Sequence, residues 1–160
     1  MTLETLKNEL QAELTQNILP FWLNKMVDHR RGGFLGRIDG HGNPVPDAEK
    51  GAVLNARILW AFAAAYRVLG KPEYLEAATR AKNYFVTHFI DTQEGGVFWS
   101  LDAQGRPHNT KKQTYALGFA IYGLSEYARA TGNEGALQQA KDLYYCIERY
   151  AFDSLNNGYV

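Results

Sequence analysis

An internal repeat of about 62 residues constrains the fold of this 160-residue chain more than any other feature of its sequence. Residues 32–44 (GGFLGRIDGHGNP) and 95–107 (GGVFWSLDAQGRP) share the pattern G-G-x5-D-x2-G-x-P, and the final NNGYV begins it a third time. Further matches 62 residues apart are Lys50 with Lys112, Trp60 with Tyr122, Gly70 with Gly132 and Asp91 with Asp153. The chain is therefore expected to stack similar units, each covering part of its neighbour's core.

Each unit is predicted to be a glycine-rich β-hairpin followed by two helices. The runs FLGRID and VFWSLD end in the turn sequences DGHG and DAQG, which favour short hairpins. The first helix of each unit is expected over 50–69 and 112–131, and a glycine ends each one, Gly70 and Gly132. The second helix is expected to begin at Pro72 in one unit and after Asn133 in the next. A helix over about 2–22 precedes the units, and its apolar stripe is Leu3, Leu6, Leu10, Leu14 and Ile18.

The two helices of a unit differ in their apolar pattern. In the second helix, residues such as Leu75, Ala78 and Phe85 share one face, while polar residues such as Arg80 and Asn83 share the other, which is typical of a half-exposed outer helix. The stretches AVLNARILWAFAAAY and YALGFAIYGLSEYA are apolar nearly all round, as a helix packed between neighbours must be. An all-α fold of alternating inner and outer helices follows, either an (α/α)6 barrel (a closed toroid) or an open α-solenoid.

The length of the repeat limits how much of such a barrel is present. Six units would need roughly 370 residues, whereas this chain supplies two helical hairpins and an opening helix, joined by short β-hairpin loops. We therefore expect residues 1–160 to form a single domain that is the amino-terminal part of a longer barrel.

Charge and composition narrow the possible partners. Lys plus Arg number 17 and Asp plus Glu also number 17, so we expect neither nucleic acid nor a membrane surface as partner, but a small neutral molecule. The single cysteine, Cys146, excludes an internal disulfide framework and fits a reducing compartment. The polar first residues do not resemble a signal peptide, and VLNARILWAFAAAY is shorter than a membrane span, so a cytoplasmic location is expected.

Three side chains of the inner helices are the candidates for a ligand site. Arg57 interrupts an apolar stretch, where a buried ion costs several kcal/mol unless a polar group meets it. Phe119 lies 62 residues after Arg57, and Tyr115 lies one turn before Phe119 on the same face. Together they predict a sugar site in which a guanidinium binds oxygens and rings stack on a pyranose. The alternative is structural, with Arg57 in an ion pair or bound to carbonyl groups and the rings in the core.

Other reaction chemistries find little support in the sequence. His29, His41 and His108 lie in predicted loops and His88 near the end of an outer helix, so no pair has metal-ligand spacing and no metal site is predicted. Glu126 stands alone on its inner helix, whereas glycoside hydrolysis needs two carboxylates. The glycine-rich hairpins match neither GxGxxG nor GK[ST] and are not phosphate loops.

The sequence resembles the amino-terminal region of the cellobiose 2-epimerases, within the N-acylglucosamine 2-epimerase superfamily. The resemblance covers nearly the whole chain and rests on GRIDG followed by KG-x-x-L-x-x-RILW-x-F, then GGVFWSLDAQGRP and KKQTYALGFAIYGLSEYARATG. It implies an (α/α)6 barrel without a cofactor that epimerises the reducing-end glucose of a β-1,4-linked disaccharide at C2. In that family one histidine removes the C2 proton, a cis-enediolate forms, and a second histidine returns a proton to the opposite face.

The resemblance also assigns roles to the three candidates. Arg57 matches the arginine that holds the developing oxyanion, and Tyr115 and Phe119 match positions that contact the sugar. None of the four histidines matches the acid and base, which lie in later inner helices, so these 160 residues alone are expected to be inactive. The alternatives are an N-acylglucosamine 2-epimerase, a mannose isomerase, a glycoside hydrolase on the same barrel, and a non-enzymatic α-solenoid binding module.

Overall fold

The computed structural model describes all 160 residues and is mostly helical. The first helix runs from residue 3 to residue 25 as α1 (Leu3–Ala12), a π-helical segment η1 (Glu13–Ile18) and α2 (Leu19–Lys25). The remaining helices are α3 (Ala52–Leu69), α4 (Pro72–His88), α5 (Thr114–Thr131) and α6 (Glu134–Tyr150). The strands are β1 (Lys50–Gly51), β2 (Ser100–Leu101), β3 (Pro107–Asn109), β4 (Phe152–Asp153) and β5 (Gly158–Tyr159).

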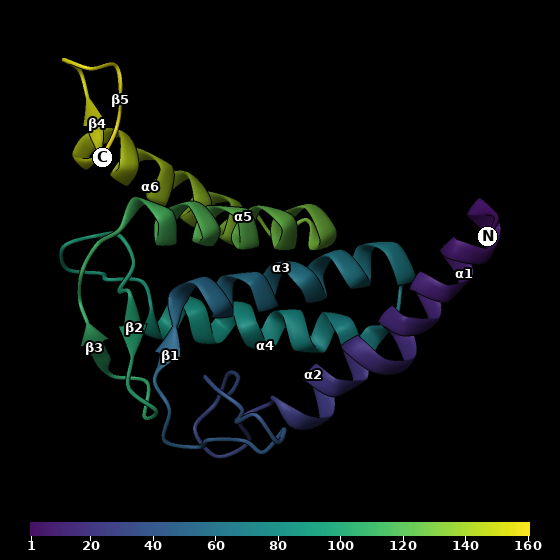
Figure 1. Cartoon of the computed structure of the whole chain (residues 1–160). Coiled ribbons are helices and arrows are strands. Elements are labelled where there is room, and N and C mark those ends of the chain that lie inside the picture. Colours follow the sequence, from purple (N-terminus) through teal and green to yellow (C-terminus); the bar gives the residue numbers. More distant parts are fainter.

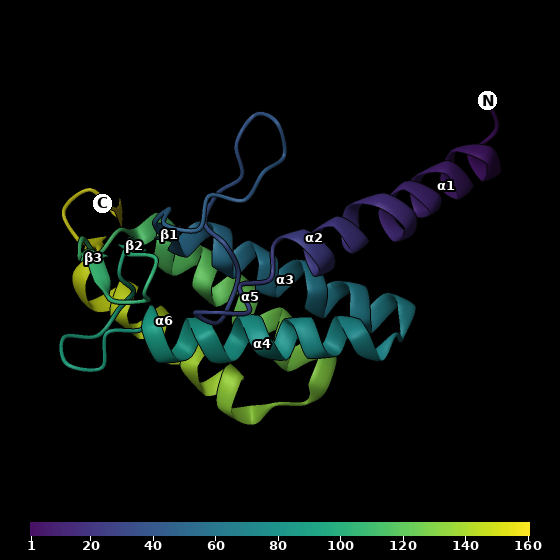
Figure 2. The ribbon, with the colours of Figure 1, turned by 90° about the horizontal axis from the view of Figure 1, so that it is seen from below.

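The helices form two layers, as the repeat predicts. The inner helices α3 and α5 lie side by side, α4 packs against α3, and α6 packs against α5 (Figure 1). Seen from the direction of Figure 2, the first helix extends away from this double layer, so that its amino-terminal end contacts none of the other helices. The core between the layers includes the fully buried side chains Phe34, Leu59, Phe62, Phe85 and Leu124.

The ends of the helices follow local sequence signals. Gly70 and Gly132 adopt the left-handed conformation, with φ of 69° and 71°, and end α3 and α5 as predicted. The Asn133 side chain accepts a hydrogen bond from the N–H of Ala136 and caps α6. The inner helices begin at residues 52 and 114, two residues later than predicted, and Lys50 belongs instead to strand β1.

The opening helix differs from the prediction in its form and exposure. Proline cannot donate the hydrogen bond to the carbonyl four residues earlier and collides with it, and the π-helical segment lies immediately before the turn that contains Pro20. The helix continues to Lys25 rather than ending at Trp22. Its apolar stripe is largely exposed at Leu3 and Leu10, where the helix extends away from the double layer, and is partly exposed at Leu14 and Ile18.

The predicted hairpins form unequally. In the second unit, β2 pairs antiparallel with β3, and β1 adds to the other edge of β2. In the first unit, FLGRID forms no ladder but only isolated bridges, Val27 with Phe34 and Ile38 with Pro44, which corrects the expectation of a regular hairpin there. A third hairpin, β4 with β5, forms where the motif begins again.

An aspartate–lysine pair fastens each loop to the start of the following inner helix. In the first unit, Lys50 Nζ donates to Asp28 Oδ2 at 2.8 Å and to the carbonyl oxygen of Gly32 at 2.8 Å. In the second unit, Lys112 Nζ donates to Asp91 Oδ2 at 2.6 Å. Arg80, expected on the exposed face of its helix, donates to the carbonyl oxygens of Asp28 and Gly33 and holds the same loop. These bonds hold the loops against the segments that lead into α3 and α5.

Helix α3 also has the length and apolar character of a membrane span. It has 18 residues with a mean hydropathy of 1.3, which corrects the expectation that this stretch is too short. Eight of its residues are buried in the core, where it packs against α4 and α5. Its hydropathy is therefore accounted for by its place in the inner layer.

Candidate active site

An open groove of about 1160 Å³ runs along the inner layer. The first helix contributes Leu14, Ile18, Leu19 and Trp22 to it, helix α5 contributes Tyr115, Gly118, Phe119 and Tyr122, and α3 contributes the rest. Sixteen of its 18 lining residues are hydrophobic, and Arg57 is the only charged one. A groove that is apolar except for a single cation suits a ligand with flat apolar faces and an oxygen that carries negative charge.

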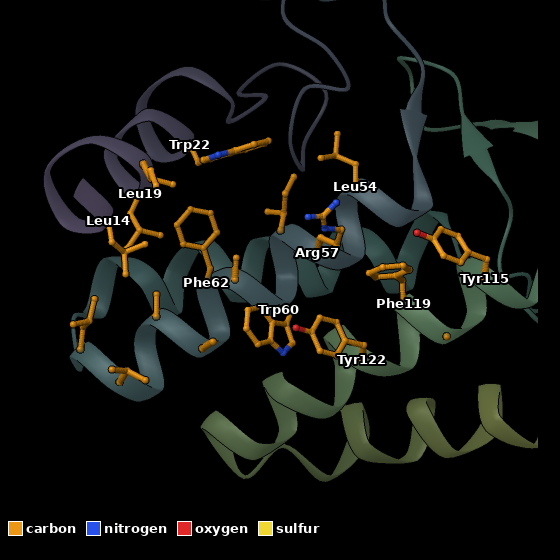
Figure 3. A pocket seen from close by; sticks show the side chains of 18 residues that line it. Leu14, Leu19, Trp22, Leu54, Arg57, Trp60, Phe62, Tyr115, Phe119 and Tyr122 are labelled. Atoms are coloured by element: carbon orange, nitrogen blue, oxygen red, sulfur yellow. The ribbon is translucent and has the colours of Figure 1, made fainter. Parts of the chain in front are cut away.

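Arg57 projects from the second turn of α3 into this groove (Figure 3). It is exposed, which corrects the expectation of a buried ion, because its side chain points into the open groove and not into a contact between helices. No hydrogen bond and no ion pair joins its guanidinium to another residue of the chain, although Arg31, Arg67, Arg80 and Arg106 all have such partners. The structural alternative, an Arg57 ion pair within this chain, is therefore wrong.

The two other predicted site residues lie beside Arg57, on helix α5. Tyr115 and Phe119 are one helical turn apart, and their rings meet edge to face with centroids 5.0 Å apart. Tyr115 is 62% exposed and Phe119 is half-buried. All three predicted side chains line the same groove, as Figure 3 shows. The structure brings them together as the repeat spacing predicts, and their roles in binding remain predictions.

A stacked pair of aromatic residues in the groove was not among the predicted site residues. Trp60 on α3 and Tyr122 on α5 stack with centroids 4.8 Å apart and an interplanar angle of 11°. Both rings line the groove one turn further along their helices than Arg57 and Phe119 (Figure 3). Their match at a spacing of 62 residues was the signal for this pair, since equivalent positions on adjacent inner helices face each other.

Glu126, the only carboxylate on the inner helices, forms a structural ion pair. Glu126 is buried, and its Oε1 accepts a hydrogen bond from Arg67 Nε at 2.6 Å, so that an ion pair links α5 to α3. Burial raises the pKa of Tyr122, the Glu126 carboxylate adds to the shift, and Arg57 opposes it. An ion-paired Glu126 outside the groove lining gives no support to a glycoside hydrolase whose acid would lie in this part of the chain.

None of the histidines reaches the groove. His29, His41 and His108 are exposed. The His88 ring packs against the tilted ring of Tyr84, and its Nδ1 lies 3.1 Å from the carbonyl oxygen of Gly105. No group of three His, Cys, Asp or Glu side chains is arranged to hold a metal ion. Within these 160 residues, the groove thus holds a cation and rings but no acid or base that could move a proton at neutral pH.

Comparison with known proteins gives this groove a family context. The chain is 58% identical over 156 residues to a cellobiose 2-epimerase of Bacteroides fragilis, with 98% of this chain and 40% of that protein covered. It superposes on the structure of cellobiose 2-epimerase from Bacillus thermoamylovorans with a TM-score of 0.95 and 41% identity, covering 98% of this chain and 40% of the other. The chain thus spans about two fifths of the length of the relatives that it matches.

More distant structures share only the architecture. A glycoside hydrolase family 76 mannosidase of Bacteroides thetaiotaomicron superposes with a TM-score of 0.72 at 15% identity, over 99% of this chain and 43% of the other. The double layer is therefore part of an (α/α)6 barrel rather than of an open solenoid. Residues 33–160 match the family described as N-acylglucosamine 2-epimerase (GlcNAc 2-epimerase). The chain belongs to the N-acylglucosamine 2-epimerase family.

Proposed function

We propose that the complete protein is a sugar 2-epimerase that converts the reducing-end glucose of a β-1,4-linked disaccharide of the cellobiose type into mannose. The similarity to cellobiose 2-epimerases supports this choice of substrate. The observation that carries the proposal is the unpartnered guanidinium of Arg57 in an aromatic groove. A guanidinium without a counter-ion can bind an anionic oxygen, and removal of the C2 proton would create such an oxygen on the sugar.

Arg57 supplies the electrostatic part of the reaction in this proposal. Removal of the C2 proton from the open-chain sugar leaves a cis-enediolate, whose negative charge lies on oxygen. Fixed donors aimed at such charge stabilise the transition state by about 3 to 4 kcal/mol each. Two histidines from later parts of the complete protein would take the proton from one face of C2 and return one to the other, and no cofactor is required.

Tyr115 and Phe119 would bind the sugar beside Arg57. A half-exposed ring offers a flat apolar face to the C–H groups of a pyranose, and both rings lie on the groove side of α5. We propose that the 160 residues alone hold part of the sugar without turning it over, because the groove contains no histidine. The expected cytoplasmic location and the absence of nucleic-acid and membrane partners belong to the same proposal.

The alternative activities differ from this one in their products. An N-acylglucosamine 2-epimerase or a mannose isomerase would use the same enediolate and the same Arg57, so only substrate and product distinguish them. A glycoside hydrolase would need a carboxylate pair, and Glu126 is committed to Arg67. A binding module would give Arg57 a structural partner, and it has none in this chain.

The test is to incubate the complete protein with cellobiose in D₂O without added cofactor and to follow the sugars by NMR. We expect glucosyl-mannose that carries deuterium at C2. Release of glucose would indicate the hydrolase instead. Absence of reaction with cellobiose, mannose and N-acetylglucosamine would contradict the proposed enzyme and favour a binding module.

A further inference from the structure

We infer that the stacked pair Trp60–Tyr122 forms the floor of the sugar site and sets how deeply the sugar sits beside Arg57. This inference rests on the proposed epimerase function. The two rings are substrate-positioning residues: they would touch the sugar but take no part in proton transfer.

The position of the pair on the inner helices supports this role. Trp60 is three residues after Arg57 on α3, and Tyr122 is three residues after Phe119 on α5, so each ring lies one turn deeper along the groove. Phe119 meets Tyr122 edge to face with centroids 6.2 Å apart, and Tyr122 stacks on Trp60 at 4.8 Å. The rings of Tyr115, Phe119, Tyr122 and Trp60 follow one another along one side of the groove, each in contact with the next (Figure 3).

The side chains that adjoin the pair on the same stretch of α3 are small. Ala61 and Ala64 line the groove one and four residues after Trp60, and the next larger groove-lining residue on that face is Val68, two turns beyond Trp60. The next charged contact between the two helices is the ion pair of Arg67 with Glu126, which lies outside the groove lining. Loss of either ring would therefore open space directly behind the level of Arg57.

The depth of the sugar matters because the enediolate has two reactive carbons. Protonation of C2 on the opposite face re-forms the carbonyl at C1 and gives the epimer. Protonation of C1 re-forms the carbonyl at C2 and gives the ketose. Both products need the same single proton and no oxidant, so the choice depends on which carbon is aligned with the acid. Rigid rings at Trp60 and Tyr122 would hold C2 in line with the acid. A deeper and looser site would also let C1 reach the acid, so that the ketose forms as a second product.

The experiment compares variants of the complete protein acting on cellobiose in D₂O. For Trp60→Ala and Tyr122→Ala, we expect kcat/KM to fall about 10- to 100-fold and the share of glucosyl-fructose among the products to rise. Tyr122→Phe keeps the stacked ring and is expected to stay within about threefold of the wild type in kcat/KM, with the same product ratio. If Trp60→Ala fails to fold, Trp60→Phe should show the same trend with a smaller change.

The matched control is Glu126→Gln, which weakens a contact between the same two helices outside the groove. It should lower the melting temperature and leave the product ratio unchanged. If the alanine variants also lower the melting temperature and leave the product ratio unchanged, the inference that Trp60 and Tyr122 position the sugar is wrong. Failure of the wild-type protein to epimerise cellobiose would overturn the proposed function and the inference that rests on it. The wild-type assay comes first, so this outcome is distinguished from a failure of the inference alone.

Discussion

At the residue scale, the isolation of Arg57 allows its role to be measured. Its guanidinium has no hydrogen-bond or ion-pair partner in the chain, so its replacement breaks no such bond among the 160 residues. We expect Arg57→Ala in the complete protein to lower kcat by about two to three orders of magnitude with a smaller change in KM, because the lost interaction forms with the enediolate. Steady-state kinetics with cellobiose measures both constants.

Another arginine of the same helix provides the control for this prediction. Arg67 lies outside the groove and pairs with Glu126, and Arg67→Lys keeps its charge. This variant is expected to retain kcat within about threefold. An Arg57→Ala enzyme with unchanged kcat would show that the oxyanion is stabilised elsewhere.

The sequence predicted which inner-helix side chains meet in one groove better than it predicted their surroundings. Repeat spacing and helical periodicity brought Arg57, Tyr115 and Phe119 to one groove, because both depend only on distances along regular helices. The exposure of Arg57 was not predictable, since it depends on where the groove lies once the helices are placed. Trp60 and Tyr122 were visible as a repeat match, but a stack between two helices becomes evident only once the helices are placed.

At the scale of the elements, Gly123 determines how closely α3 and α5 approach. A Cβ atom at this position would lie 2.7 Å from the carbonyl oxygen of Ala56 and 3.3 Å from Leu59 Cδ2. Backbone atoms cannot move aside without moving the helix. We expect Gly123→Ala to destabilise the complete protein by about 1 to 3 kcal/mol, measured by urea unfolding.

Gly118 on the same helix is the matched control for Gly123. A Cβ atom there would meet nothing within 4 Å. Gly118→Ala should therefore leave the stability unchanged or raise it by about 0.5 to 1 kcal/mol through helix propensity alone. Equal effects of the two substitutions would mean that α3 and α5 are not in close contact at Gly123.

The aspartate–lysine pair of the first unit makes stability depend on pH. Burial opposes ionisation of Asp28, but Lys50 and the backbone N–H groups of Arg31 and Arg30 outweigh it, so that the pKa of Asp28 lies below its ordinary value of 3.8. As pH falls, the unfolded chain therefore takes up this proton before the folded one does. The stabilisation is complete above about pH 5 and is lost below about pH 4, as the pH passes through the lowered pKa.

The variant Asp28→Asn tests this linkage in the complete protein. It leaves the fully buried Lys50 ammonium without its carboxylate, so we expect a loss of about 3 to 5 kcal/mol at pH 7 and a shallower fall of stability in acid. Asp142→Asn, on the exposed face of α6, should change neither. A parallel acid dependence in the wild type and in Asp28→Asn would contradict the linkage.

Sequence patterns predicted elements where local signals suffice. Capping residues and periodicity placed both ends of α3 and α5, and the first residues of α4 and α6, to within about two residues. The π-helical segment before Pro20 and the missing ladder of the first hairpin were not foreseen. The first depends on the choice between α-helical and π-helical hydrogen bonding, and the second on the choice between a regular strand ladder and isolated bridges. The pattern of apolar residues is the same for both members of each choice.

At the scale of the whole molecule, the open groove leaves large apolar surfaces uncovered. Leu3, Leu10 and Val68 are 88%, 62% and 68% exposed, and the groove itself is almost entirely apolar. We expect the isolated 160 residues to self-associate, which light scattering at several concentrations detects. The complete protein, whose remaining helices would cover these surfaces, should not show the same association.

A monodisperse, compact monomer of the 160 residues would contradict this prediction. Double substitution of Leu10 and Val68 by glutamate provides the matched variant, since both side chains are exposed and neither is proposed to bind sugar. It should reduce the association of the isolated 160 residues if the apolar surfaces cause it.

The aspartate–lysine pairs also bear on the order in which the protein is made. During synthesis, Asp28 is added 22 residues before its partner Lys50, and Asp91 is added 21 residues before its partner Lys112. Neither aspartate can form its ion pair until that lysine has been added. Asp153 already holds its own turn through Leu155 and Asn156, and the position one repeat after Lys112 lies beyond residue 160. On a ribosome that adds about 5 to 20 residues per second, each loop would be fastened roughly one to four seconds after its aspartate is added. Closure of the units would then follow the direction of translation, each new inner helix locking the loop made just before it.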